Sequence, residues 1–202
     1  MGNGVAVRSL GPKEVWRLLQ RSWAVGFTRL RWRWRLGALG HGAIIEQPLA
    51  IRNPRAVAIG SRVTILRGSL FADLQPGNGL YPKITVGDGT IIAYRFQCNC
   101  ALRVSIGENV GIASGVFITD SDHVVEPGGV PITRSQKFVT RPVEVQANCW
   151  IGQNAVILKG VTVGHDSIIG ANSVVTRDVP PCSVAVGNPA RVIKRLAQQE
   201  WR

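Results

Sequence analysis

The chain has 202 residues, with 24 lysines and arginines against 12 aspartates and glutamates, so its formal net charge at pH 7 is +12. This length suits one domain with appendages and argues against two full domains. The four cysteines form no CxxC pair and no apolar run approaches the ~18 residues that a spanning helix needs, so we expect a cytoplasmic protein with reduced thiols and no metal site.

A basic, tryptophan-rich segment comes first, and we assign it residues 1–56. Residues 1–40 hold Lys13 and seven arginines against the single Glu14, a net charge of +7. Pro12 and Glu14 are typical of a helix start, so a helix is expected to begin there. The run RLRWRWRLG that follows alternates arginine with leucine or tryptophan and fits either a strand or a helix.

Residues 12–36 also indicate an anionic partner. Tryptophan and arginine together favour the lipid headgroup layer, where indole rings sit at the polar boundary and guanidinium groups meet phosphate. We therefore expect peripheral contact with the inner face of the cytoplasmic membrane. The alternative is that the segment packs on the end of the following domain or on a neighbouring subunit. No nucleic-acid-binding module is recognisable, so no nucleic-acid partner is expected.

An internal repeat of period six occupies residues 57–187. It opens at Ile59, is interrupted by a Pro- and Gly-rich loop at 73–82, and slips by two residues before Ile106. A long excursion at 120–140 then breaks it, and excursions from a regular solenoid usually carry function.

The repeat is clearest after this excursion. An apolar column recurs at Val145, Ile151, Ile157, Val163, Ile169 and Val175, and a second column at Cys149, Ala155, Val161, Ser167, Ser173 and Val179. A period of six suits neither a helix nor a flat strand. It is typical of a β-solenoid, in which each hexad supplies a short strand and a corner. Residues 188–202 are expected to form a C-terminal capping helix.

The hexads IGQNAV, VGHDSI and IGANSV and the ending VVTRDVPPCSVAVGNPARVIKR resemble the hexapeptide-repeat acyltransferases, in particular the sugar O-acetyltransferases of the maltose, galactoside, exopolysaccharide and O-antigen types. The resemblance covers about residues 57 to 195. It implies an all-β, left-handed parallel β-helix that assembles as a homotrimer with active sites between subunits. It also implies acetyl-CoA as the acyl donor and a saccharide as the acceptor.

The resemblance singles out His123, which ends the hexad ITDSDH, as the general base. A neutral imidazole with a pKa near ~6.5 can take the proton of a sugar hydroxyl as that hydroxyl attacks a thioester. Asp120 and Asp122 are candidates to orient the imidazole. The same resemblance assigns the coenzyme to residues that match family motifs: Trp150, Ala171, Thr176, Arg177, Arg191 and Lys194.

The acceptor site departs from the family pattern. Where simple-sugar enzymes carry an asparagine one coil before the base, this chain reads AYRFQCNCAL, so Asn99 or Gln97 is expected to contact the substrate. Together with the basic N-terminal segment, this favours a larger acceptor, such as a lipid-linked saccharide in exopolysaccharide or lipopolysaccharide biosynthesis.

Other functions remain open at this point. They are an N-acyltransferase acting on an amino sugar, a serine acetyltransferase, and a non-enzymatic β-helix scaffold. Carbonic anhydrase chemistry on this fold needs three zinc-binding histidines at matched coil positions, which the three histidines of the chain do not supply.

Overall fold

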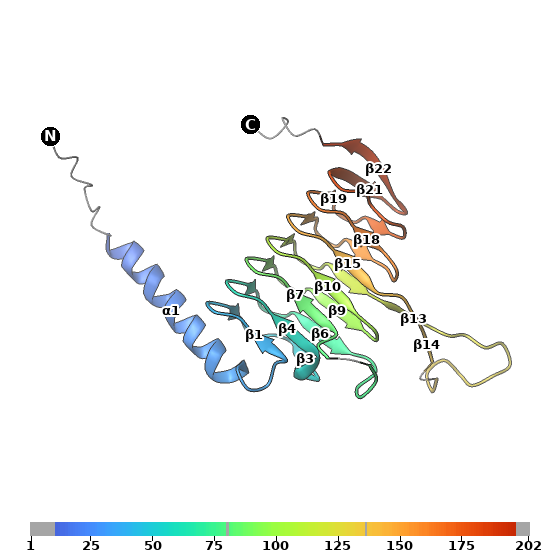
Figure 1. Ribbon diagram of the computed structural model, residues 1–202, viewed down its shortest axis with the longest axis horizontal. Coiled ribbons are helices and arrows are strands. Elements are labelled where there is room, and N and C mark those ends of the chain that lie inside the picture. The colour runs from blue at the N-terminus through green and yellow to red at the C-terminus, as the bar shows by residue number, and fades with distance from the viewer. Residues whose placement is uncertain (1–10, 80, 136, 197–202) are drawn as a thin grey trace.

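The computed structural model describes residues 11–79, 81–135 and 137–196, and shows a three-sided, left-handed parallel β-helix preceded by one long helix (Figure 1). Each complete coil contributes one short strand to each of three sheets, and these strands pair in parallel with their counterparts in the neighbouring coils. The predicted hexapeptide-repeat fold is confirmed.

Three sheets, here called A, B and C, form the faces of the described part of the solenoid. Sheet A contains β1 (Ala38–Leu39), β4 (Val57–Ile59), β7 (Ile84–Val86), β10 (Val104–Ile106), β15 (Val143–Val145) and β18 (Thr162–Val163). Sheet B contains β2 (Ile44–Ile45), β5 (Thr64–Ile65), β8 (Ile91–Ile92), β11 (Gly111–Ile112), β16 (Trp150–Ile151), β19 (Ile168–Ile169), β21 (Ser183–Gly187) and β22 (Ala190–Arg195). Sheet C contains β3 (Ala50–Arg52), β6 (Leu70–Asp73), β9 (Gln97–Cys100), β12 (Phe117–Thr119), β17 (Val156–Ile157) and β20 (Val174–Val175).

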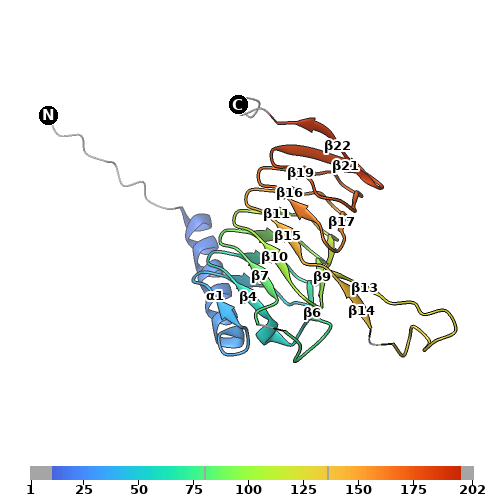
Figure 2. The ribbon, with the colours of Figure 1, turned by 45° about the vertical axis from the view of Figure 1, so that its right-hand side comes forward.

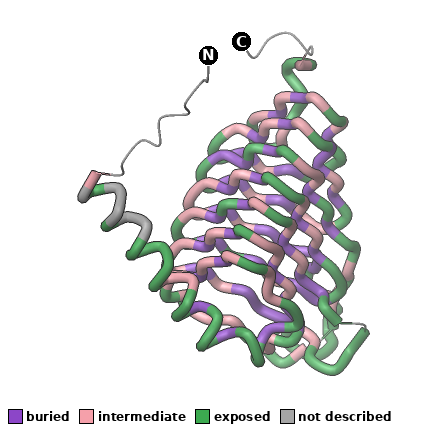
Figure 3. Tube along the Cα trace, turned by 60° about the vertical axis from the view of Figure 1, so that its left-hand side comes forward, coloured by how far each residue is buried: buried purple, intermediate pink, exposed green. Residues whose placement is uncertain are grey.

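The two residue columns seen in the sequence line the interior of the prism. Ile151, for example, lies in register with Ile112 of the preceding coil and Ile169 of the next, and all three are buried. The buried residues run as a continuous core along the coils (Figure 3). Stacking therefore buries aliphatic ladders that no single coil could bury alone.

The solenoid begins earlier than residue 57, which corrects the sequence-based boundary. Strands β1, β2 and β3 already form a first coil, with Leu39, Ile45 and Ile51 at the period-six positions. A short 3-10 turn, η1 (Pro54–Ala56), adds two residues before the next coil. This shift of phase hides the first coil when the repeat is counted forward from Ile59.

The predicted C-terminal helix is also wrong for its described part. Residues Ala190–Arg195 form β22, which pairs antiparallel with β21, while 197–202 lie outside the described residues. The turn at Asn188 and Pro189 reverses the chain, and the β-branched Val192 and Ile193 favour a strand. The last coil has an open sheet edge, whose backbone groups need partners, and β22 supplies them.

The N-terminal segment forms α1 (Pro12–Trp32), so the RLRWRWRLG run begins as a helix and leaves it at Trp32. The hydroxyl Oγ1 of the buried Thr28 accepts the backbone N–H of Ile45 at 3.0 Å, and Trp32 and Leu36 join the solenoid core. The N-terminal part of α1 extends away from the first coil (Figure 1). Among the described residues, no helix combines the length and apolar character that crossing a membrane requires.

Candidate functional site

The excursion at 120–140 forms a projecting arm at the corner between sheets C and A (Figures 1 and 2). Its root is an antiparallel pair, β13 (Ser121–His123) and β14 (Phe138–Thr140), with His123 opposite Phe138. The two rings lie 4.6 Å apart between centroids, and the imidazole is exposed to solvent. The structure therefore holds His123 near the solenoid by its backbone pairing and by one aromatic contact.

Asp120 is buried at the point where the arm leaves the coil. Its carboxylate accepts the backbone N–H groups of Ala101 at 2.8 Å and of Leu102 and Arg103 at 2.7 Å each. These are the residues of the irregular turn where the sequence repeat slips by two. These three charge-assisted hydrogen bonds fix the turn to the arm. Asp120 therefore stabilises the local backbone.

Asp122 forms an ion pair with Lys159, which links the arm root to the corner between β17 and β18. Within the described residues, neither Asp120 nor Asp122 is hydrogen-bonded to His123. Asn99 lies in register with Thr119, one coil before the arm, whereas Gln97 is exposed two residues earlier on β9. Asn99 is therefore nearer to the arm root than Gln97.

A groove of about 560 Å³, here called the arm-root groove, opens beside the arm. Its walls come from three irregular segments: the loop at 74–82, the turn that Asp120 holds, and the return of the arm to the solenoid. The side chains of Gln75, Asn78, Arg103 and Thr140 line it and offer amide, guanidinium and hydroxyl groups.

A buried ion pair supports the loop wall of this groove. Lys83 Nζ lies 2.9 Å from Asp73 Oδ1 and also donates to the carbonyl of Gln75 at 2.6 Å. Asp73 Oδ2 accepts from Asn53 at 2.7 Å and from the Tyr81 hydroxyl at 3.1 Å. Burial alone would raise the pKa of Asp73, but the hydrogen bonds from Lys83, Asn53 and the Gln75 N–H outweigh it and hold the pKa below its usual range.

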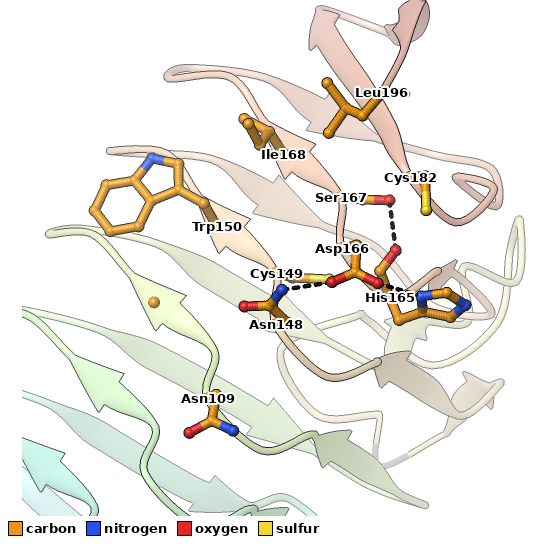
Figure 4. A pocket seen from close by; sticks show the side chains of 11 residues that line it. Asn109, Asn148, Cys149, Trp150, His165, Asp166, Ser167, Ile168, Cys182 and Leu196 are labelled. Atoms are coloured by element: carbon orange, nitrogen blue, oxygen red, sulfur yellow. Dashed lines mark hydrogen bonds and ion pairs between the residues drawn. The ribbon is translucent and has the colours of Figure 1, made fainter. Parts of the chain in front are cut away.

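A larger groove of about 740 Å³, here called the Trp150 groove, runs along sheet B to its corner with sheet A (Figure 4). The half-exposed ring of Trp150 lies over Gly111, where a Cβ would come within 2.6 Å of the ring. Glycine at this position leaves room for the indole. Ile168 and Leu196 add apolar surface to the same groove.

A polar cluster lies at the corner of the Trp150 groove, with Asn148, His165, Asp166 and Cys182 facing one another (Figure 4). Asp166 Oδ1 accepts from the Asn148 amide, and Asp166 Oδ2 lies 2.6 Å from His165 Nδ1. These contacts with Asn148 and His165 lower the pKa of Asp166. Asp166 is therefore a fixed, ionised carboxylate.

The residues assigned to the coenzyme by resemblance do not all lie in one groove of the chain. Trp150 lines the Trp150 groove, and Arg191 and Lys194 lie on β22 at the far end of the same sheet. Ala171 lies at the corner between sheets B and C, and Thr176 and Arg177 at the corner between sheets C and A. All six residues are exposed.

The sequence matches one family model and is similar to a known acetyltransferase. Residues 142–177 match the model "Bacterial transferase hexapeptide (six repeats)". The galactoside O-acetyltransferase of Escherichia coli strain K12 is 39% identical over 139 residues, which cover 65% of this chain and 67% of that enzyme.

Two solved structures share the fold. A hexapeptide-repeat acetyltransferase of Vibrio cholerae O1 biovar eltor, complexed with acetyl coenzyme A, aligns with a TM-score of 0.56 at 21% identity and covers 98% of this chain and 93% of its own. A mutant N-acyltransferase of Bacillus cereus, in complex with dTDP and coenzyme A, aligns with a TM-score of 0.65 at 19% identity and covers 86% and 89%.

Two parts of the site were not predicted from the sequence: the lining of the arm-root groove and the polar corner of the Trp150 groove. The lining of the arm-root groove depends on how far the loop at 74–82 and the turn at 101–103 project. The spacing of residues in the sequence does not indicate this. The second has a weak signal in the sequence. Asn109, Asn148, Asp166 and Cys182 occupy the same corner of successive coils, and each has a positive φ of 53° to 58°. Asparagine and aspartate are common at such positions.

Proposed function

This chain belongs to the hexapeptide-repeat acetyltransferases, and we propose that it transfers an acetyl group from acetyl-CoA to a hydroxyl of a saccharide, with His123 as the general base. The observation that carries the proposal is the position of His123. It stands at the root of the arm, which also borders a groove lined by groups that bind sugar hydroxyls, among them Asn78, Arg103 and Thr140.

The proposed reaction needs a general base, a binding surface for the acceptor and a binding surface for acetyl-CoA. A ring nitrogen of neutral His123 accepts the proton of the acceptor hydroxyl, which makes the hydroxyl oxygen nucleophilic. Acetyl-CoA, when bound, supplies an activated thioester carbonyl. Asp120 acts indirectly. It starts the arm, and its carboxylate holds the backbone of the turn at 101–103 beside it. We assign it and Asp122 as positioning residues.

The Trp150 groove fits the pantetheine arm of the coenzyme. Trp150, Ile168 and Leu196 offer an apolar wall, and the exposed Arg191 of β22 supplies positive charge for phosphates. Ala171, Thr176, Arg177 and Lys194 complete the proposed coenzyme surface. Several of these residues lie at other corners of the same chain, so they would meet the coenzyme from more than one subunit.

The homotrimer that the family resemblance implies is supported by the same distribution. Trp150 belongs to sheet B, whereas His123 leaves the corner between sheets C and A, so a single chain keeps the two surfaces on different sides. A neighbouring copy whose sheet B faces the arm would bring the thioester to the base. We therefore propose that the complete active site forms between subunits.

Turnover measured with a panel of acceptors tests this function. The full chain, incubated with acetyl-CoA and simple sugars, nucleotide sugars, amino sugars, serine or extracted lipid-linked oligosaccharides, is expected to release free coenzyme A with a saccharide and to form an alkali-labile ester. An amide product with amino sugars would favour the N-acyltransferase instead, and turnover with serine alone a serine acetyltransferase. If acetyl-CoA is neither bound nor cleaved, the proposal fails and the scaffold becomes the leading hypothesis.

We also propose that α1 brings the enzyme to the inner face of the cytoplasmic membrane, where lipid-linked precursors of exopolysaccharide or lipopolysaccharide are modified. Large exposed apolar side chains, here called the apolar stripe, recur at spacings of three and four along α1 and into the turn that follows it: Trp16, Leu19, Trp23, Phe27 and Leu30 on the helix, and Trp34 after it. Trp23 is 78% exposed and Leu30 is 83% exposed. Exposed arginines flank the stripe, at 21, 29, 31, 33 and 35.

The charge pattern favours lipid over a second copy of α1. Between residues 15 and 45 every lysine, arginine, aspartate or glutamate position is an arginine, so two such helices would repel each other. An anionic bilayer attracts the same arginines and accepts the apolar stripe at its boundary.

Vesicle sedimentation checks the membrane contact. The full chain is expected to bind vesicles with anionic lipid, to bind weakly to zwitterionic vesicles, and to lose affinity as salt rises. Replacing Arg29 by glutamine should weaken anionic binding about fivefold, since a basic residue near the surface contributes about 1 kcal/mol. Trp23→Ala should weaken it further, while Tyr94→Ala, which removes an exposed aromatic ring elsewhere, should not. If Trp23→Ala changes only the oligomeric state, the stripe packs on protein.

A further inference from the structure

The polar corner of the Trp150 groove holds a set of side chains that the acetyl-transfer mechanism does not use. His165, Asp166 and Cys182 each offer one ligand atom, and these atoms lie within 4.8 Å of one another. All three line the groove (Figure 4). From this arrangement we propose that the corner binds a divalent transition-metal ion, with zinc as the best match, through one atom of each residue.

The chemistry of the three groups points to zinc. An imidazole, a thiolate and a carboxylate are its usual protein ligands, at distances of about 2.0 to 2.3 Å. Tetrahedral geometry at those distances separates neighbouring ligand atoms by roughly 3.5 Å, which the cluster reaches with small side-chain rotations. His165 would exchange its hydrogen bond to Asp166 for the ion. The fourth position faces the groove and would hold a water molecule.

The backbone fixes the ligands relative to one another. Cys182 lies one coil after His165 and Asp166, and its N–H donates to the His165 carbonyl at 2.9 Å. The Ser167 hydroxyl donates to the Pro180 carbonyl at 3.1 Å and accepts the Ser183 N–H at 3.2 Å. Asp166 is held further by the Asn148 amide. Rigid donors of this kind are what a metal site requires.

Cys182 differs from the other cysteines in two ways. Cys98, Cys100 and Cys149 are buried, and burial raises the pKa of their thiols, whereas Cys182 is only half-buried and faces the groove. It also has a φ of +53° at a corner where the three preceding coils carry asparagine or aspartate. A residue other than glycine, asparagine or aspartate in this left-handed region loses roughly 1 to 2 kcal/mol of conformational free energy. A role as a metal ligand would account for a cysteine at this position.

The proposal revises the expectation, drawn from the sequence, of no metal site. That expectation was based on the absence of CxxC pairs and of three matched histidines. A site made of one histidine, one aspartate and one cysteine from two coils shows neither pattern. An ion here would cross-link successive corners near the C-terminal end of the solenoid. It would act without His123, so the test of the proposed function and the test of this site can fail separately.

Metal binding is tested with Co²⁺ and Zn²⁺ as probes on the full chain, reduced and washed with chelator. We expect one Co²⁺ per chain, with a thiolate-to-cobalt charge-transfer band, and displacement by Zn²⁺. Cys182→Ser should abolish the band, and His165→Gln and Asp166→Asn should each weaken Zn²⁺ binding at least about 10-fold, the lower bound seen when only an outer-shell partner is lost. Zn²⁺ should raise the Tm of the native chain and not that of Cys182→Ser.

Control variants and two possible outcomes show whether the metal site exists. His41→Gln removes an exposed histidine outside the corner and should bind Co²⁺ as the native chain does, as should His123→Ala. Because His165, Asp166 and Cys182 lie at a surface corner, the metal-free variants should keep the native Tm. A native chain with no charge-transfer band and no retained Zn²⁺ would overturn the proposal, as would a band that persists in Cys182→Ser.

Discussion

Replacing His123 by alanine is expected to lower kcat for acetyl transfer by about 10²- to 10⁴-fold, the range that a positioned general base contributes. The imidazole is exposed and touches Phe138, so its removal leaves no buried cavity and the fold should persist. Affinity for acetyl-CoA should stay unchanged, because His123 is assigned to the acceptor proton.

The measurement is thiol release at saturating acetyl-CoA with the acceptor that the native chain uses, together with calorimetric binding of the coenzyme. His41→Ala serves as the control, since His41 is an exposed histidine near the first coil. If His123→Ala keeps native turnover, another group is the base and the mechanism proposed above is wrong.

Replacing Lys83 by methionine is expected to lower the free energy of unfolding by about 3 to 5 kcal/mol. Lys83 is 1% exposed and Asp73 is 6% exposed, so the substitution leaves a buried carboxylate without its cation. Lys137→Met is the matched control, because Lys137 and Glu126 form an ion pair at the surface, where such pairs contribute about 0 to 1 kcal/mol. Denaturant unfolding followed by circular dichroism measures both.

The pH dependence of stability gives a second readout for the same pair. The folded-state pKa of Asp73 is lowered, so its stabilising contribution is fully present above the unfolded value, about 3.9, and is lost as pH falls through the folded value. The native chain should therefore lose stability below about pH 4. Lys83→Met should lose less over that window. A variant as stable as the native chain would show that the pair does not hold the loop at 74–82.

The period of six was enough to predict the solenoid because each coil places an apolar residue inward at a fixed count. Where the count is interrupted, prediction was weaker. The first coil was missed because η1 adds two residues between Ile51 and Ile59. The C-terminal strand was missed because Ala190, Lys194 and Arg195 suit a helix while Val192 and Ile193 suit a strand, and the open edge of β21 decides in favour of the strand.

The candidate site divides in the same way. His123 could be found because it ends a regular hexad, and the structure places it at the root of the predicted excursion. The partners of Asp120 could not be found, since its carboxylate reaches a turn 17 to 19 residues earlier that comes close only through coil stacking. The arm-root groove needs three irregular segments at one corner, and their relative heights depend on loop geometry rather than on residue spacing.

Each end of the described solenoid is covered in part, which limits how copies can meet. A stack of parallel coils with free edges would be a template for unlimited end-to-end growth into fibres. Here the first coil is plugged by Trp32 and by the bond from Ile45 to Thr28, and the last coil is met by β22, which runs in the opposite direction. At the C-terminal end, a further parallel strand could not take the place of β22 on the edge of sheet B. These contacts disfavour end-to-end stacking, and the proposed homotrimer instead uses the lateral faces, where a closed ring limits its own growth.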